Sequence, residues 1–372
     1  MTNRIPRRDQ ISVVIWNPTD VGCAPRDPDS GYGVAKPSGA TIDSGPDGFR
    51  ELALEKEEFE RLTGGPLRLA LDDIVSHPRL PEARRAYLDS FLGVYDGDPF
   101  MVRLLLQTGR FFVFHTAAVL EHSQDLSRRE TWFTVSALKQ HIAMLGFASG
   151  RQVDHLVKRL LAVGFLELRR IPADGRVRLL ATTDKLRAHH SKWLAAHYVP
   201  LAVLYPQHDY TPVFSHDRGF HAAHCRACLP FTSAGARLMA TIPDILLFFG
   251  HSAGPLIMSA VLKAAMDAGD PNAAVPYAEA GSRFGVSSTH VRVLMQSAQS
   301  AGLVRITGRG GRSIEILPRF WESHDRGMAI GMYLHDAVNV VAMREWAKRS
   351  GRDAKDLGNE GATSAAASRR SA

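Results

Sequence analysis

The chain has 372 residues, 45% hydrophobic and 22% charged, so we expect about two globular domains with a sizeable core. Its apolar runs, such as Pro243–Gly250, are shorter than the ~18 residues of a membrane span, and its three cysteines exclude a disulfide-rich secreted scaffold. We therefore expect a cytoplasmic protein without a membrane partner, and the formal net charge of +7 is compatible with a polyanionic one.

The first 70 residues are predicted to form an N-terminal arm. Residues 17–49 are rich in Gly, Pro, Ser and Asp, and such a segment cannot bury enough apolar surface to offset its ordering entropy. Glu51–Arg61 combines strong helix formers with alternating charge, which indicates an exposed helix. At the other end, residues 350–372 are small and polar, and we predict a disordered tail there.

The region between the arm and the tail repeats itself. The motif V-S-H-P-R begins at Val75, and F-S-H-D-R begins 139 residues later at Phe214. His197 and His335 differ by 138 positions, and further matches keep nearly the same shift and order. Such self-similarity predicts two copies of one unit, with chance similarity between helical segments as the alternative.

We place the first unit at residues 71–199, a linker at 200–213 and the second unit at 214–349, and we call the units copy one and copy two. Copy one begins its core helix at Asp98, a suitable N-cap, and Pro99. The elements expected after it are a helix at Thr134–Ile142, a turn around Gly146, a helix at Ser149–Val163, strands at Phe165–Ile171 and Arg176–Leu180, and a helix at Thr183–His197.

Copy two shows the same order of elements. The expected elements are helices at Tyr277–Phe284 and Ser288–Ser300, strands at Leu303–Ile306 and Ser313–Leu317, and a helix at Arg319–Trp346. Gly285 stands in the turn between the first two helices, and the buried-type Val291 follows six residues later. This spacing is typical of a helix-turn-helix, because the glycine permits the left-handed turn and the valine anchors the second helix.

Helix, turn, helix and hairpin is the order of a winged helix-turn-helix, and the chain resembles transcription regulators of the MarR type. The usual D-x-R wing signature is echoed in Asp174-Gly175-Arg176 and is absent from the second wing. The resemblance implies a mainly α fold with small β-hairpin wings and a last helix used in dimerisation. Because such regulators are homodimers of one unit, it further implies two tandem winged helix-turn-helix domains in a pseudo-two-fold arrangement, similar to a covalent dimer.

Positive charge is concentrated around the second helix and the hairpin of each copy. Residues 151–178 carry seven basic and three acidic residues, a net charge of +4. Residues 283–319 carry six basic residues and one acidic residue, a net charge of +5. The excess of the whole chain is therefore located in the two segments with which a winged helix contacts a duplex.

Two groups of side chains are candidates for DNA contact. Outward polar positions near the start of each second helix can reach base edges, and basic positions on the helix and wing can reach phosphates or the minor groove. The base-reading candidates are Arg151, Gln152, His155, Ser288, Thr289, His290, Arg292 and Gln296. The phosphate or minor-groove candidates are Lys158, Arg159, Arg169, Arg170, Arg176, Arg305, Arg309 and Arg312.

One helix face carries possible metal ligands. His221, His224, Cys225 and Cys228 follow the spacing of a single face, and imidazole and thiolate are ligands that zinc prefers. The aligned positions of copy one hold Glu82, Arg85, Ala86 and Asp89, so the repeat does not require a metal. We expect an ordinary helix face and no cofactor, with a zinc site and a redox pair as weaker alternatives.

These features predict a sequence-selective double-stranded DNA-binding protein, a prokaryotic transcription regulator, and not an enzyme. A plasmid or phage replication initiator with tandem winged helices is one alternative. A protein-interaction scaffold whose winged helices do not bind DNA is another. Homodimerisation and a small-molecule effector stay open.

Overall fold

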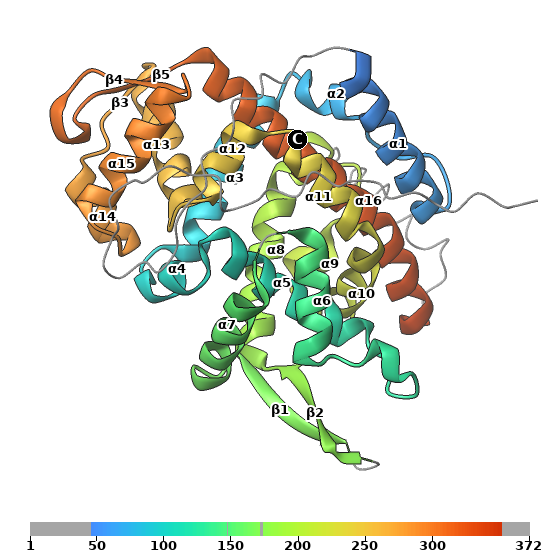
Figure 1. The fold of residues 1–372 in the computed structure, drawn as a ribbon. Coiled ribbons are helices and arrows are strands. Elements are labelled where there is room, and N and C mark those ends of the chain that lie inside the picture. The colour runs from blue at the N-terminus through green and yellow to red at the C-terminus, as the bar shows by residue number, and fades with distance from the viewer. Residues whose placement is uncertain (1–45, 147, 172–173, 352–372) are drawn as a thin grey trace, which may run out of the picture. The chain divides into compact units, whose positions relative to one another are not determined.

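The computed structural model describes residues 46–146, 148–171 and 174–351, and this part of the chain is mainly helical with a few short antiparallel strand pairs (Figure 1). The predicted flexible arm up to residue 45 and the predicted tail from residue 352 lie outside the described residues. Within them, no single helix is long and apolar enough to cross a bilayer. Helices α12 (Pro243–Phe249) and α13 (Gly254–Ala268) meet that criterion only when taken together across a bend of 117°.

Helix α1 spans Pro46–Thr63, and the prediction that it is exposed is wrong on one face. Phe59 is fully buried, with its ring centroid 5.2 Å from that of Phe231 and 5.5 Å from that of Tyr333. Glu55 is also buried and forms an ion pair with Arg237 at 2.7 Å. The alternating charges therefore cover only the outer side of a helix that packs on copy two.

Copy one contains the expected elements. They are α2 (Leu71–Val75), α3 (Leu80–Tyr95), α4 (Pro99–Leu105), α5 (Thr108–Ser123), α6 (Val135–Leu145), α7 (Gly150–Ala162), β1 (Leu166–Ile171), β2 (Asp174–Thr182) and α8 (Asp184–Leu204). Asp98 caps α4 by accepting a hydrogen bond from the Met101 amide at 3.0 Å, as predicted. The helix predicted from Pro99 is broken into α4 and α5 at Leu106, whose carbonyl accepts a hydrogen bond from the Ala253 amide of copy two.

Copy two has the same order of elements, with α11 (Thr232–Ala240) and β3 (Asn272–Ala273) in addition. Its elements are α9 (Thr211–Phe214), α10 (Arg218–Cys228), α11 (Thr232–Ala240), α12 (Pro243–Phe249), α13 (Gly254–Ala268), β3 (Asn272–Ala273), α14 (Tyr277–Phe284), α15 (Ser288–Ser300), β4 (Val304–Ile306), β5 (Ile314–Ile316) and α16 (Pro318–Ser350). Helices α14 and α15 begin and end at the predicted residues. Strand β3, which pairs antiparallel with β5, was not predicted.

The two copies pack on each other reciprocally. Within each copy the first long helix lies against the last, α3 on α8 and α10 on α16. Between the copies, α10 packs on α5 while α3 packs on α13, and α8 packs on α16. Each copy thus contributes the same helix to the core of the other, as the two subunits of a two-fold dimer do.

Equivalent residues of the two copies meet where α8 and α16 pack. The ring centroids of His197 and His335 lie 5.5 Å apart. Tyr87 also lies 5.4 Å from His197, and His224 lies 6.0 Å from His335, both measured between ring centroids. A residue on a two-fold axis contacts its own equivalent, so the contact of His197 with His335 agrees with the shift found in the sequence.

The turn glycines of the two copies provide a matched pair for a stability test. Gly146 and Gly285 both have left-handed backbones, with φ of 71° and 68°. Alanine at either position should lower the free energy of unfolding by about 1–2 kcal/mol because of its Cβ atom. At Gly285 that Cβ would also lie 3.0 Å from Arg103 Nη1 and 3.1 Å from Pro99 Cβ, whereas nothing lies within 4 Å of it at Gly146. Urea unfolding should therefore rank Gly285→Ala as the less stable variant, and equal stabilities would contradict this packing.

Candidate nucleic-acid interface

Helix α15 is fixed by a buried stripe, which turns its other face outward. Its buried side chains are Val291, as predicted, and Leu294, Met295 and Ala298. Ser287 caps the helix by accepting a hydrogen bond from the His290 amide at 3.1 Å. Helix α14 packs closely on the turn, because a Cβ at Gly281 would lie only 2.7 Å from the Val286 carbonyl oxygen. This close approach holds the start of α15 in one position.

The outward face of α15 carries most of the predicted base-reading side chains. Ser288, Thr289, Arg292 and Gln296 are all exposed. His290 is half-buried, and its Nε2 lies 2.9 Å from the Ser252 carbonyl oxygen, which the imidazole contacts instead of facing solvent. The structure therefore places four of the five candidates of this helix on one accessible surface.

The second wing is a short hairpin held against α15. The Ile306 amide donates a hydrogen bond to Gln299 Oε1 at 2.8 Å, and the Val275 amide donates one to the Gly311 carbonyl at 2.9 Å. A Cβ at Gly311 would lie 2.1 Å from the Val275 oxygen. Glycine is needed there for this close packing, whereas nothing lies within 4 Å of a Cβ at Gly310.

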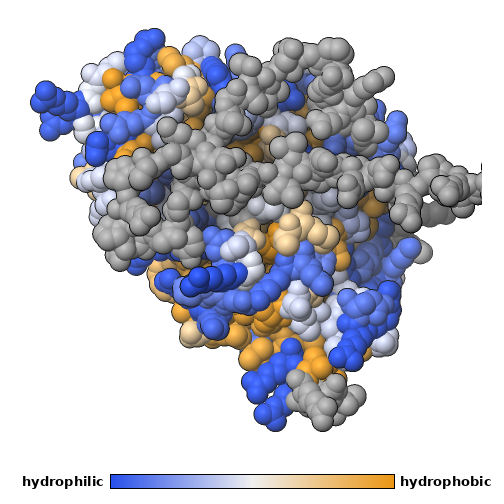
Figure 2. Space-filling model, in the orientation of Figure 1, coloured by the Kyte–Doolittle hydropathy of each residue, from blue (hydrophilic) through white to orange (hydrophobic). Residues whose placement is uncertain are grey.

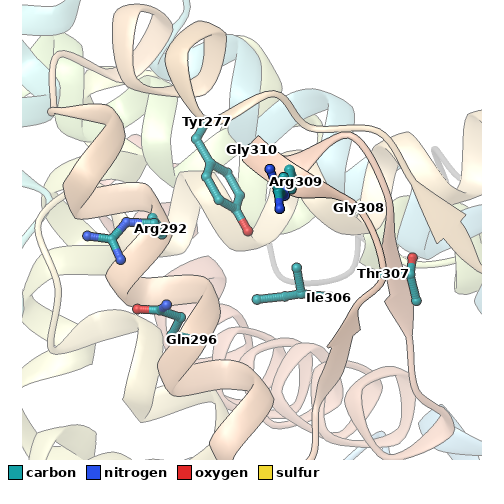
Figure 3. A pocket seen from close by; sticks show the side chains of 8 residues that line it. All are labelled: Tyr277, Arg292, Gln296, Ile306, Thr307, Gly308, Arg309 and Gly310. Atoms are coloured by element: carbon teal, nitrogen blue, oxygen red, sulfur yellow. The ribbon is translucent and has the colours of Figure 1, made fainter.

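A cavity of about 290 Å³ opens between α15 and the wing (Figure 3). Its lining is formed by Tyr277, Arg292, Gln296, Ile306, Thr307, Gly308, Arg309 and Gly310. Tyr277 is buried, and among the described residues its hydroxyl has no hydrogen-bond partner. Burial raises the pKa of this hydroxyl, so it is a hydrogen-bond donor at neutral pH. The sequence analysis did not identify Tyr277, whose only signal is its place at the start of α14.

Helix α7 of copy one has the same construction. Its buried positions are Val153, Leu156, Val157 and Leu160, and its exposed polar positions are Arg151, His155, Lys158 and Arg159. Gln152 is engaged locally, because its Oε1 accepts the Ser149 amide at 2.7 Å in a capping box. The pattern S-x-x-Q is a known signature of this cap and predicts that role for Gln152.

The first wing, β1–β2, presents basic side chains on both strands. Arg170 and Arg178 are partners in the strand register, and both are exposed. Arg169 forms an ion pair with Glu167 at 2.7 Å. The side chain of Arg176 lies outside the described residues. Along this wing, Arg170 and Arg178 therefore carry the charge that is open to an anion.

Ion pairs divide the basic residues of both copies into two sets. Arg305 pairs with Glu315 at 2.5 Å, Arg283 with Asp96 at 2.7 Å and Arg319 with Asp244 at 2.7 Å. In the part of the chain that the structure describes, the following have no acidic partner: Arg151, Lys158, Arg159, Arg170, Arg178, Arg292, Arg309 and Arg312. At the end of the face where β4 and β5 lie, hydrophilic side chains stand among smaller hydrophobic patches (Figure 2).

The acidic residue of α7 is compensated. Asp154 forms an ion pair with Lys139 of α6 at 2.5 Å. Lys139 lies outside the two segments counted in the sequence, so the local charge at this helix is more positive than the sequence count suggests. The Asp154 carboxylate therefore repels a phosphate less than an unpaired carboxylate would.

Comparisons of the chain with protein-family models, with curated proteins and with solved structures find no match. The site must therefore be interpreted from its own geometry and charge.

The weaker zinc candidate is brought together only in part. His221 Nε2 lies 4.0 Å from Cys225 Sγ, as their helix spacing predicts. His224 Nε2 is instead hydrogen-bonded with the Tyr198 hydroxyl at 3.0 Å, and Cys228 is not among the atoms gathered around His221. The four-residue set predicted on α10 is thus not the set that the fold assembles.

Proposed function

We propose that the protein is a sequence-selective double-stranded DNA-binding protein, with two tandem winged helices in one chain, that acts as a prokaryotic transcription regulator. The observation that carries the proposal is the groove between α15 and the second wing. There Arg292 and Arg309, neither with an acidic partner among the described residues, flank a buried tyrosine hydroxyl. A phosphate supplies the negative charge and acceptor oxygens that these three groups lack.

Base recognition is assigned to the outward side chains that remain available. Arg292 and Gln296 are one turn apart on α15, and their head groups suit guanine and adenine edges in the major groove. On α7, the exposed Arg151 and His155 are also one turn apart and are assigned the same task. Gln152 and His290 are less suited, because a side-chain polar atom of each is engaged in an intramolecular contact.

The reciprocal packing supports a pseudo-two-fold arrangement of the two winged helices. The contact of His197 with His335 and the exchange of α3 and α10 are the contacts expected at a dyad. In Figure 1 the two hairpins lie at opposite ends of the view, β1–β2 at the bottom and β4–β5 at the top. One chain then offers both recognition helices to one duplex, as a dimeric regulator does.

Sequencing genomic fragments that the purified chain protects from nuclease tests this proposal. A dyad in the protein predicts inverted half-sites about one helical turn apart, near ~10 base pairs centre to centre. Protected sites upstream of genes would support regulation. Direct repeats at a replication origin would support the initiator alternative instead. Failure to retard any genomic duplex at ~50 mM salt would contradict DNA binding, because non-specific binding is strongest at low salt.

A further inference from the structure

Three potential metal ligands converge between α5 and α10. The ligand atoms of His122, His221 and Cys225 all lie within 4.8 Å of one another. His122 comes from α5 of copy one, whereas His221 and Cys225 stand on adjacent turns of α10 in copy two. Imidazole nitrogen and thiolate sulfur are the donors that zinc and its neighbours among the divalent ions prefer.

The cluster contains polar atoms that the protein does not satisfy. His122 Nε2 is buried and has no hydrogen-bond partner among the described residues. Cys225 is fully buried, and its contact with His221 Nε2, at 4.0 Å, is long. Because buried side-chain nitrogens are normally hydrogen-bonded, an unpartnered imidazole beside a buried thiol indicates a missing partner.

A further imidazole contacts one of the three. His190 of α8 is buried, and its Nδ1 lies 2.8 Å from His221 Nε2. An ion bound to His221 Nε2 would take the place of this contact and lie within reach of His190. Three imidazoles and one thiolate would then complete the four-coordinate sphere typical of a structural zinc site.

We propose that His122, His221 and Cys225, with His190 as the fourth donor, form a site for one divalent ion of the zinc class that ties copy one to copy two. Among the described residues, this group of ligands is found once. At the shift of 138–139, Met328 stands in place of His190, and Glu82 and Ala86 stand in place of His221 and Cys225. The inference does not depend on DNA binding.

Binding is an exchange of a proton for the ion. The histidines coordinate through neutral imidazole nitrogens, while Cys225 binds as thiolate, so its sulfur–hydrogen bond breaks and one proton passes to solvent. The ion and the thiolate together leave one positive charge. A carboxylate, that of Glu121, stands beside His122 in the chain, and its oxygen accepts a hydrogen bond from the Thr182 amide at 2.8 Å.

Titrating the metal-free full-length chain with Co²⁺ tests the site. We expect one ion per chain, the intense visible bands of four-coordinate Co²⁺, a near-ultraviolet thiolate-to-metal band and release of about one proton. Cys225→Ser should remove the thiolate band, and His122→Gln should weaken Co²⁺ binding at least tenfold, about the loss seen when a metal's supporting groups are removed. Zn²⁺ should displace Co²⁺ and abolish both sets of bands.

Cys228→Ser is the matched control, because Cys228 is a thiol of the same helix outside the cluster. This variant should keep the thiolate band. The proposal is overturned if Co²⁺ binds without that band, if Cys228→Ser removes it, or if the native chain binds no Co²⁺. If Cys225→Ser fails to fold, the test uses His122→Gln alone. His122 is only half-buried near the end of α5, so this variant is expected to fold. Unchanged Co²⁺ affinity in that variant would overturn the site.

Discussion

Replacing Arg309 and Arg312 together by alanine is expected to weaken binding to every duplex sequence by on the order of 100-fold, at about 1.5 kcal/mol for each lost charged contact. Both side chains are exposed and have no acidic partner among the described residues, so they are available to phosphates or the minor groove. Because each phosphate contact contributes about 0.9 to the slope of log K against log salt, the slope should fall by about 2. Fluorescence anisotropy between ~50 and ~200 mM salt measures both quantities.

The control for the wing variant is Arg283→Ala. Arg283 is exposed on the neighbouring helix α14, but its guanidinium is held by Asp96 at 2.7 Å. Its removal should change affinity and salt slope little. If the double wing variant bound as the native chain does, with the same slope, the wing would have no part in DNA binding. If Arg283→Ala bound DNA as weakly as the double wing variant does, the loss of affinity would not be caused by the loss of a specific wing contact.

The second large effect expected is unfolding in mild acid. Burial lowers the pKa of His197 and of His251 to about 4 and that of His224 to about 3, and it lowers the pKa of His335 well below the ordinary value. These rings are neutral in the folded chain, whereas the unfolded chain binds protons below about pH 6.5. The unfolded state therefore gains protons that the folded state cannot accept, and stability is lost as the pH falls from 6.5 toward 4.

Each such histidine changes the free energy of unfolding by up to about 1.4 kcal/mol per pH unit within this window. Three of them acting together would remove about 4 kcal/mol per unit, against a total stability of about 5–15 kcal/mol. As the pH is lowered, we expect the chain to unfold cooperatively before about pH 4.5. The midpoint of urea unfolding, determined at each pH in the presence of a chelator, measures this loss of stability.

Variants at the contact between the copies test the cause of this pH dependence. The double variant His197→Gln with His335→Gln should be less dependent on pH than the native chain, because two of the buried imidazoles are gone. His155→Gln, at an exposed position of α7, should leave the pH dependence as it is. A native chain equally stable at pH 7 and pH 5 would contradict the account of the histidine core.

Much of the local structure could be predicted from the sequence. The bounds of α14 and α15 follow from signals within a few residues: a left-handed glycine at Gly285, a capping serine at Ser287 and a buried stripe that includes Val291. The repeat shift also anticipated that His197 and His335 are equivalent. Such signals are local or periodic, so they can be identified in the sequence without knowledge of the tertiary contacts.

The features that could not be predicted depend on contacts between distant segments. The break at Leu106 coincides with a hydrogen bond from Ala253, and Phe59 is buried by Phe231 and Tyr333. His290 turns to a carbonyl of the α12–α13 loop, 38 residues away. Sequence spacing likewise grouped the α10 histidines and cysteines by helix face, whereas the fold brings in His122, almost 100 residues earlier.

The most direct test of the central claim is the number of chains on one isolated inverted-repeat site, measured as the mass of the protein–DNA complex in solution. Two recognition helices in one polypeptide predict one chain per site, with both half-sites protected. They also predict that Arg151→Ala and Arg292→Ala each relax sequence preference in one half-site only, by about 1–3 kcal/mol. Two chains on each site would contradict the claim that one polypeptide carries both recognition helices. A variant at Arg151 without effect on either half-site would contradict it too.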